Sequence, residues 1–121
     1  MLYHKDTGIP KRVRGCVPMG VKDIVYSRHA EGEFYDKNGK IMPPNKLNFA
    51  ECEVIEVTIF GQIVDKLVLR KPYNDTHDLV IVVIPTVEEQ TVNKKKWFAK
   101  TVWLNHKEDT HKTLDKSRMP A

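Results

Sequence analysis

The sequence predicts an α+β protein in which an N-terminal helix packs on a four-stranded antiparallel β-sheet. Two observations indicate this class: one helix signal lies in the first third of the chain, and four apolar runs follow it without another helix between them. The 121 residues contain no repeat, low-complexity tract or linker, so we read a single domain. Within it we expect an irregular basic arm (1–21), a helix-plus-sheet core (22–105) and a polar tail (106–121).

The predicted helix begins after Ser27, because serine is a preferred residue at a helix N-cap. Ala30 and Phe34 are four residues apart, so they share one helix face that can pack on a sheet. Gly39 lies just past the expected C-terminus, where glycine is favoured. Residues 40–50 contain two consecutive prolines, which cannot continue a helix, and we expect a long loop there.

Four strands are predicted after this loop. Residues 52–60 alternate apolar and polar side chains, which is typical of a strand with one buried face. Gly61 permits a tight turn into residues 63–70, so these two runs predict a β-hairpin. The run 78–85 is almost continuously apolar, as in a central strand covered on both faces. Residues 97–105 provide the last strand.

Charge and hydropathy narrow the class of protein. The net charge is +4 and the isoelectric point is about 9.1, which favours a polyanionic partner such as RNA. The basic side chains gather in three segments, 11–14, 93–97 and 111–118, and a solvated surface is the alternative to one shared groove. No apolar run approaches the roughly 20 residues of a membrane span, and the N-terminus does not resemble a secretory signal. We therefore expect a cytoplasmic protein without a membrane partner.

Several kinds of site are not indicated. Cys16 and Cys52 do not form a CxxC pair, so we read them as ordinary reduced thiols. His106 and His111 are five residues apart, which on a helix points them to different faces and disfavours a metal site. The sequence also has no glycine-rich phosphate loop and no GxSxG motif. We predict neither a metal nor a cofactor.

Metal-free cleavage of RNA requires few residues, and this chain contains suitable ones. A base removes the proton from the 2′-OH, an acid protonates the leaving 5′-oxygen, and cations or donors stabilise the charged intermediate. Histidine titrates near neutrality, and arginine can bind a phosphate with two hydrogen bonds. The candidates for catalysis are His29 on the helix, Arg70 at the end of the second strand, and Thr101 on the last strand.

Strand alternation restricts which side chains can act together. Thr101 and Trp103 share one strand face, whereas Lys100 belongs to the opposite face. Lys100 and Thr101 therefore cannot both line one cleft unless a β-bulge intervenes. Trp103 is a candidate platform for stacking a base, and Lys66 shares a strand face with Arg70.

We expect four residues to bind nucleic acid: Arg28, Lys66, Lys100 and Trp103. Arg28 and His29 are adjacent on the helix and point about 100° apart, so at most one of them faces the sheet. His77 with Asp78, and Asp109 with His111, are weaker candidate pairs.

Each of these residues also has a plain structural interpretation. A histidine at a helix start is more often a surface residue or a local cap than a catalyst. Arg70 is followed by Lys71 and Pro72 and could simply end its strand. Trp103 could belong to the core, as tryptophan in a strand usually does.

The arrangement resembles the RelE/barnase/colicin-type ribonuclease toxins. The resemblance rests on "YSRHAEGEF" in the helix, the hairpin ending in Arg70, and the strands "LVIVVI" and "KTVWLN", and it covers roughly residues 22–105. It implies metal-independent RNA cleavage by His29, Arg70 and Thr101, and a protein inhibitor (an antitoxin) as partner. The long loop at 40–50 and the C-terminal tail depart from that family.

Two other hypotheses use the same scaffold. The chain could be a small, basic, non-enzymatic module that binds nucleic acid or a host protein, for example one encoded by a phage. It could also be a structural assembly protein, for which an exposed edge strand and a stable oligomer would be expected. An enzyme requires its catalytic residues within reach of one phosphate, whereas a binding module requires only basic residues on one surface.

Overall fold

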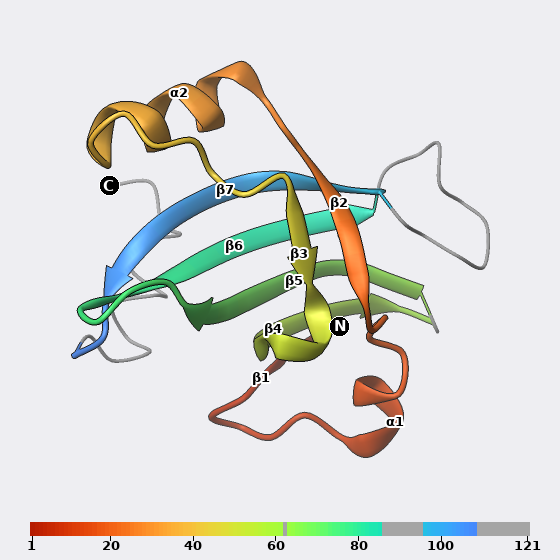
Figure 1. Ribbon diagram of the computed structural model, residues 1–121. Helices are drawn as coiled ribbons and strands as arrows, with labels where there is room; N and C mark the ends of the chain where they lie inside the picture. Colours follow the sequence, from red (N-terminus) through yellow and green to blue (C-terminus); the bar gives the residue numbers. More distant parts are fainter. Residues whose placement is uncertain (62, 86–95, 109–121) are drawn as a thin grey trace.

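The computed structural model describes residues 1–61, 63–85 and 96–108. Within these residues the chain is mostly β, with one seven-stranded mixed sheet and two short α-helices (Figure 1). The elements are β1 (Leu2–His4), α1 (Lys11–Arg14), β2 (Val21–Tyr26), α2 (Arg28–Lys37), β3 (Lys46–Asn48), the 3-10 helix η1 (Phe49–Glu51), β4 (Glu53–Phe60), β5 (Ile63–Pro72), β6 (His77–Pro85) and β7 (Lys96–His106). The strand order is β1-β4-β5-β6-β7-β2-β3.

The predicted fold class is therefore wrong. The sheet has three strands more than the four predicted, it is mixed because β2 pairs in parallel with β7, and α2 is not N-terminal to all of it. The segment 1–21, expected to be irregular, contains β1 and α1, and the loop expected at 40–50 contains β3. These strands are three to six residues long and pair with partners distant in sequence, so no local periodicity predicts them.

The four predicted strands lie close to their expected positions and form β4–β7, each antiparallel to the next. Figure 1 shows β2 and β3 crossing in front of these strands, with α2 above β7 and with α1 and η1 below. The sheet therefore curls, so that β2 and β3 lie in front of the concave side of β4–β7. Among the helices of the described residues, none is long and apolar enough to cross a membrane.

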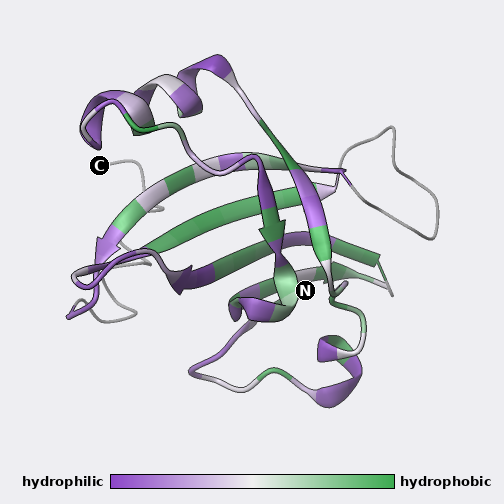
Figure 2. Ribbon diagram, viewed as in Figure 1, coloured by the Kyte–Doolittle hydropathy of each residue, from purple (hydrophilic) through white to green (hydrophobic). Residues whose placement is uncertain are grey.

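The main core fills the inside of this curl. Figure 2 shows the hydrophobic residues concentrated on the central strands, while α1 and α2 carry mostly hydrophilic residues. Phe49 of η1 packs edge-on against Trp97 of β7, with 5.4 Å between the ring centroids. The largest buried side chains of the main core are Phe34, Phe49, Leu67, Leu69, Leu79, Ile81 and Trp97.

A second, smaller cluster lies on the opposite side of β4–β7, which we call the outer face. It consists of Ile55, Val68, Val80 and Val82, with Trp103 packed against them. On β6 the buried residues alternate between the main core and this cluster, which confirms the prediction of a central strand covered on both faces.

The start of α2 is as predicted. The Ser27 hydroxyl accepts a hydrogen bond from the backbone N–H of Ala30 at 3.1 Å, which satisfies a donor of the first helical turn. Ala30 and Phe34 are buried, so they form the face that packs on the sheet. Gly39 has φ of +70°, a conformation that suits glycine after a helix end. The helix therefore has a defined place beside β7.

Candidate functional site

A cleft of about 490 Å³ lies between α2 and β7. It exists because β2 pairs only with residues 96–99 of β7, and α2 instead of a strand packs beside the rest. Two predicted residues, Thr101 and Trp103, lie in its β7 wall. The lining is completed by Glu33, Phe34, Lys37 and Asn38 from the α2 side and by Val102 and Leu104 from β7.

A β-bulge in β7 allows the side chains of Lys100 and Thr101 to lie on the same side of the sheet. Ala99 pairs with Val83 and Thr101 pairs with Val82, so Lys100 is the extra residue. Trp97 and Ala99 before the bulge, and Val102 and Leu104 after it, all pack in the main core.

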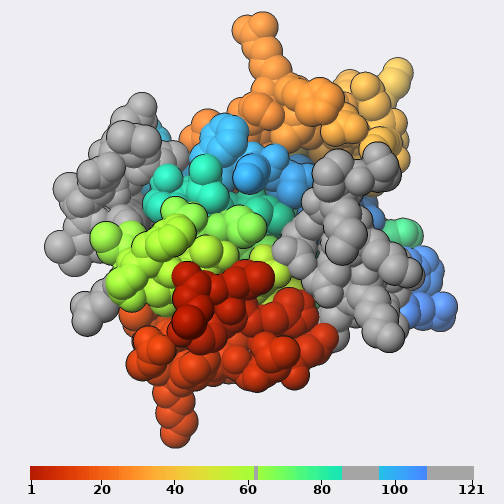
Figure 3. Space-filling view, turned by 180° about the vertical axis from the view of Figure 1, so that it is seen from behind, coloured from red at the N-terminus to blue at the C-terminus, as the bar shows by residue number. Residues whose placement is uncertain are grey.

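Because neighbouring strand residues alternate, Lys100, Thr101 and Trp103 are all directed away from the main core. They therefore lie on the same side of the sheet as Arg70 and the second apolar cluster. Figure 3 shows this outer face from behind, with the strands between the N-terminal segment and α2. The bulge brings Lys100 and Thr101 to one surface, as the sequence analysis required for both to act together.

His29 lies on the solvent side of α2. Its side chain is 85 % exposed, and its Nε2 is 3.2 Å from an Oε2 atom of Glu33. Glu33 in turn lines the cleft and is 3.4 Å from the Lys37 ammonium group. Arg28 is also exposed, so neither member of the Arg28–His29 pair faces the sheet. His29 reaches the cleft only through Glu33.

Trp103 contributes a notable hydrogen-bond donor to this region. Its Nε1 atom is buried and has no acceptor among the described residues. An indole N–H is only a donor, and leaving it unsatisfied costs free energy. The half-buried ring packs on the outer apolar cluster while it lines the cleft. Lys37 and the Thr101 hydroxyl can donate to an anionic ligand in the cleft, beside the Glu33 carboxylate, whereas the buried indole N–H is closed to it.

Arg70 forms an ion pair on the outer face. Its Nε donates to an Oδ2 atom of Asp78 at 2.8 Å, and Lys107 donates to Oδ1 of the same carboxylate at 2.7 Å. Burial by itself would raise the pKa of Asp78, but the hydrogen bonds from Lys107 and Arg70 outweigh it and lower the pKa below its ordinary value. Asp78 is therefore ionised at neutral pH and holds Arg70 in place.

The predicted residues thus fall into two groups. Arg70 pairs with Val80, which pairs with Trp103, so Arg70 and Trp103 lie two strands apart, about 10 Å between backbones. Lys66 is 3.9 Å from the buried Glu56 carboxylate, also on the outer face. Among the described residues, no hydrogen bond or ion pair joins Arg70 to His29 or to Thr101.

The weaker candidate pairs have other surroundings. His77 pairs with His106 across β6 and β7, and their rings meet edge-on with 5.2 Å between centroids. Because Asp78 is directed to the opposite sheet face from its neighbour His77, the two do not form a dyad. Asp109 and His111 lie outside the described residues.

Neither cysteine is part of the lining of the α2–β7 cleft. Both are free thiols, and burial raises the pKa of Cys52 to about 11, so it is protonated at neutral pH. Within the described ranges, no three His, Cys, Asp or Glu side chains are grouped so that they could hold a metal ion. That the protein needs neither metal nor cofactor stays a prediction.

The α2 wall of the cleft was not predicted from the sequence. Glu33 is four residues after His29, a spacing at which helix side chains meet, so this pair could have been found. Lys37 repeats the same spacing one turn later. That the wall faces Trp103 depends on the packing of α2 beside β7, which no local pattern shows.

Comparisons with known proteins do not supply a function. No protein-family model, no curated protein and no solved structure matches this chain. The functional argument below therefore depends on the geometry of the α2–β7 cleft and on the residues that surround it.

Proposed function

We propose that this protein is a metal-independent endoribonuclease that binds RNA at the α2–β7 cleft. The observation that carries the proposal is the His29–Glu33 pair on α2, next to a cleft whose other wall contains Thr101 and Trp103. This combination includes a proton-transfer group, an orienting carboxylate and hydrogen-bond donors for a phosphate. It also agrees with the basic net charge of the chain.

In this mechanism His29 transfers the proton. If Nε2 donates to Glu33, the lone pair of Nδ1 is available to remove the proton of a 2′-OH group. The Glu33 carboxylate then stabilises the imidazolium that forms, as an acidic partner does for other catalytic histidines. As the P–O5′ bond breaks and the 2′,3′-cyclic phosphate forms, the imidazolium returns its proton to the leaving 5′-oxygen. The high exposure of His29 leaves its ring accessible to a large substrate.

Both walls of the cleft supply stabilisation of charge. The Lys37 ammonium and the Thr101 hydroxyl can donate to the oxygens of the phosphate as negative charge develops, and the Trp103 ring lies beside them in the lining. Lys100 extends the positive charge along the strand. Arg70 is held by Asp78 away from the cleft, so we assign it a role in the charge of the outer face and not in the proton transfer.

A labelled RNA of mixed sequence, incubated in EDTA, tests this proposal. The wild type should cleave it, and His29→Ala should reduce the rate at least about a hundredfold, the effect of losing a general acid or base. Glu33→Gln should reduce it about tenfold, because the histidine loses its orienting partner. Asp36→Asn is the matched control on the same helix and should leave the rate unchanged. Equal rates for the wild type and His29→Ala would contradict the mechanism.

A second candidate function is RNA binding without cleavage. It is favoured by the absence, among the described residues, of a contact that joins His29, Arg70 and Thr101. A binding module would retain RNA on a filter with strong dependence on salt and would cleave it in no variant. A protein inhibitor that covers the cleft belongs to the first proposal and would compete with RNA for it, whereas a host protein as partner belongs to the binding module.

A further inference from the structure

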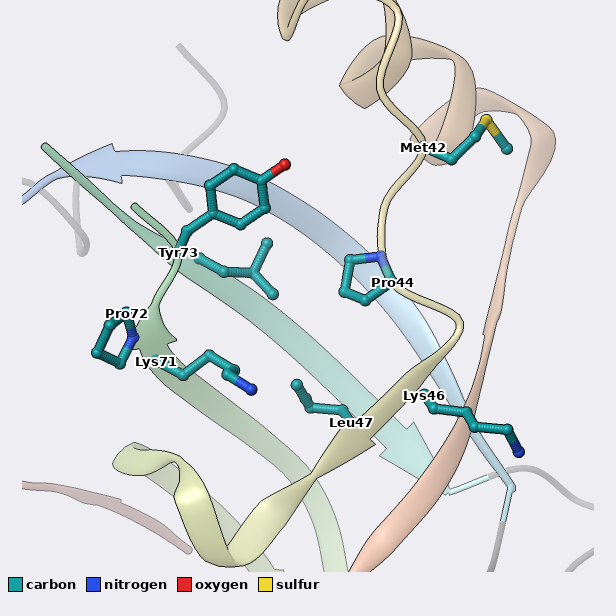
Figure 4. Close-up of a pocket in the computed structure, with 8 residues that line it drawn as sticks. Met42, Pro44, Lys46, Leu47, Lys71, Pro72 and Tyr73 are labelled. Carbon is teal, nitrogen blue, oxygen red and sulfur yellow. The ribbon is translucent and has the colours of Figure 1, made fainter. Parts of the chain in front are cut away.

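A separate groove of about 310 Å³ opens between β3 with its preceding loop and the ends of β5 and β6 (Figure 4). Leu47 and Leu79 form its apolar floor, and Met42 and Pro44 line one side. Tyr73 lies on the other side and is 36 % exposed. A flat ring could enter between the tyrosine and the loop, because aromatic side chains stack favourably on planar groups.

Both walls of this groove are held in place by hydrogen bonds. The Asn74 side chain accepts from the backbone N–H groups of Thr76 and His77, at 3.0 Å and 2.7 Å, and the Tyr73 N–H donates to the His77 carbonyl. On the other side, the Tyr26 hydroxyl donates to the Pro44 carbonyl. Burial raises the pKa of Tyr26, so this donor keeps its proton. The opening is therefore preformed.

The charge of the groove favours an anion. The two charged side chains in its lining are both lysines, Lys46 and Lys71. Lys46 is 2.7 Å from an Asp23 oxygen, whereas Lys71 lies at 3.6 Å from the exposed Glu51 carboxylate. Figure 4 shows the Lys71 chain reaching across the floor toward Leu47. An ammonium group therefore lies next to the apolar floor, on the side of the tyrosine.

The groove is next to the α2–β7 cleft. Leu79, in the floor of the groove, pairs across the sheet with Leu104, which lines the cleft. The chain from Asn38 to Met42 also joins the two, because Asn38 lines the cleft and Met42 lines the groove. Paired residues on adjacent strands lie about 5 Å apart, so a floor residue of the groove and a wall residue of the cleft are direct neighbours in the sheet.

We propose that this groove is a nucleotide subsite of single-stranded RNA, in which a base stacks on Tyr73 and a phosphate is attracted by Lys71. The inference rests on the proposed function, because it extends the RNA path from the cleft. Stacking on one tyrosine face would be tolerant of base identity, since every base has a π-face. The subsite therefore supplies affinity for unpaired RNA and little sequence preference.

The test measures binding of a fluorescently labelled octanucleotide RNA by anisotropy, with all variants made in the His29→Ala chain so that the RNA stays intact. Tyr73→Ala should weaken binding about five- to hundredfold, and Tyr73→Phe should change it less than about twofold, because the ring is retained. Phe60→Ala removes another exposed aromatic at the β4–β5 turn and should have no effect. Lys71→Gln should reduce the slope of log Kd against log salt by about 0.7.

A second readout does not depend on the fold of the Tyr73 variant. The methyl resonance of Met42, isotope-labelled in the unsubstituted chain, should shift when a non-cleavable 2′-O-methyl RNA is added, because a stacked base adds a ring current beside it. The subsite would be contradicted if Tyr73→Ala did not change RNA binding and the Met42 methyl resonance did not shift. Cleavage of RNA by the wild type in that case would still support the nuclease. Binding that depends on Tyr73 without any cleavage would support the subsite and overturn the nuclease. No RNA binding by any variant would overturn both.

Discussion

The two faces of β4–β7 differ in what they contain. The inner face is largely apolar and packs against β2, β3 and the helices through residues such as Leu69 and Trp97. The outer face has a small apolar cluster around Val80, surrounded by charged groups that are paired with one another, such as Arg70 with Asp78. The inner face therefore specifies the fold, whereas the outer face and the edge of β7 provide the charges that a polyanion would meet.

The largest expected effect separates the two faces on one strand. Leu69→Ala, on the inner face, should lower the free energy of unfolding by about 2–5 kcal/mol. The truncated side chain would leave a cavity that the closely packed main core fills only in part. Val68→Ala, directed to the outer cluster, should cost about 1–2 kcal/mol, since less apolar surface is lost. Urea denaturation measures both. Equal losses of unfolding free energy in the two variants would contradict the distinction between the inner and outer faces.

The next effect tests whether charge pairing stabilises the outer face. Asp78→Asn leaves Arg70 and Lys107 without their shared carboxylate, and we expect a loss of about 2 kcal/mol at pH 7. Arg70→Met, which replaces the cation by an apolar chain, is the companion variant. Stability that rises in Asp78→Asn would show that the pair serves a role other than stability.

The same pair predicts a dependence on pH. Because the pKa of Asp78 is lowered in the folded state, its contribution is present above the unfolded value of about 3.9 and is lost as pH falls through the folded value. The urea midpoints of wild type and Asp78→Asn should therefore converge on acidification below about pH 4. A difference that stays constant down to pH 2 would contradict this assignment.

A smaller effect concerns the helix that forms the cleft. Ser27→Ala removes the cap of α2 and should cost about 1 kcal/mol, whereas Ser27→Gly should cost only a few tenths. Thermal unfolding followed by circular dichroism measures both. An alanine variant as stable as the wild type would mean that the Ser27 hydroxyl does not stabilise the helix.

The smallest effect on stability should accompany a clear effect on activity. Glu33→Gln removes an exposed ion pair and should change the free energy of unfolding by less than about 0.5 kcal/mol. The RNA cleavage rate should nevertheless fall, as argued above. A large loss of stability would place Glu33 in the packing of α2 and weaken its role as the partner of His29.

How much of this could be predicted from sequence depends on the range of the interactions. The alternation of apolar and polar residues in 52–60 predicts β4, because successive side chains of a strand point to opposite faces of the sheet. The capping serine predicts the start of α2, also from local residues. Asp23 and Lys96 are partners in the sheet but lie more than seventy residues apart, so neither segment indicates the other.

The candidate site likewise combines features that the local sequence predicts with features that depend on distant residues. Strand alternation indicated that Lys100 and Thr101 need a bulge to share one side, and the bulge occurs at Lys100. The pairing of Arg70 with Asp78 depends on the register between β5 and β6, which a hydrophobic pattern does not specify for particular charged residues. His29 was singled out by its residue type and its partner Glu33 follows from helix spacing, but the exposure of His29 depends on which face of α2 packs on the sheet.

The sequence by itself determined the central hairpins, the helix start and the inventory of titratable side chains, because these depend on residues close to one another in the chain. Only the tertiary structure decided the sheet order, the parallel pairing of β2 with β7 and the cleft beside α2. The physical reason is that short edge strands such as β1 and β3 gain their hydrogen bonds from distant partners. Their conformation is set by the partner and by burial of the core, and not by their own residues.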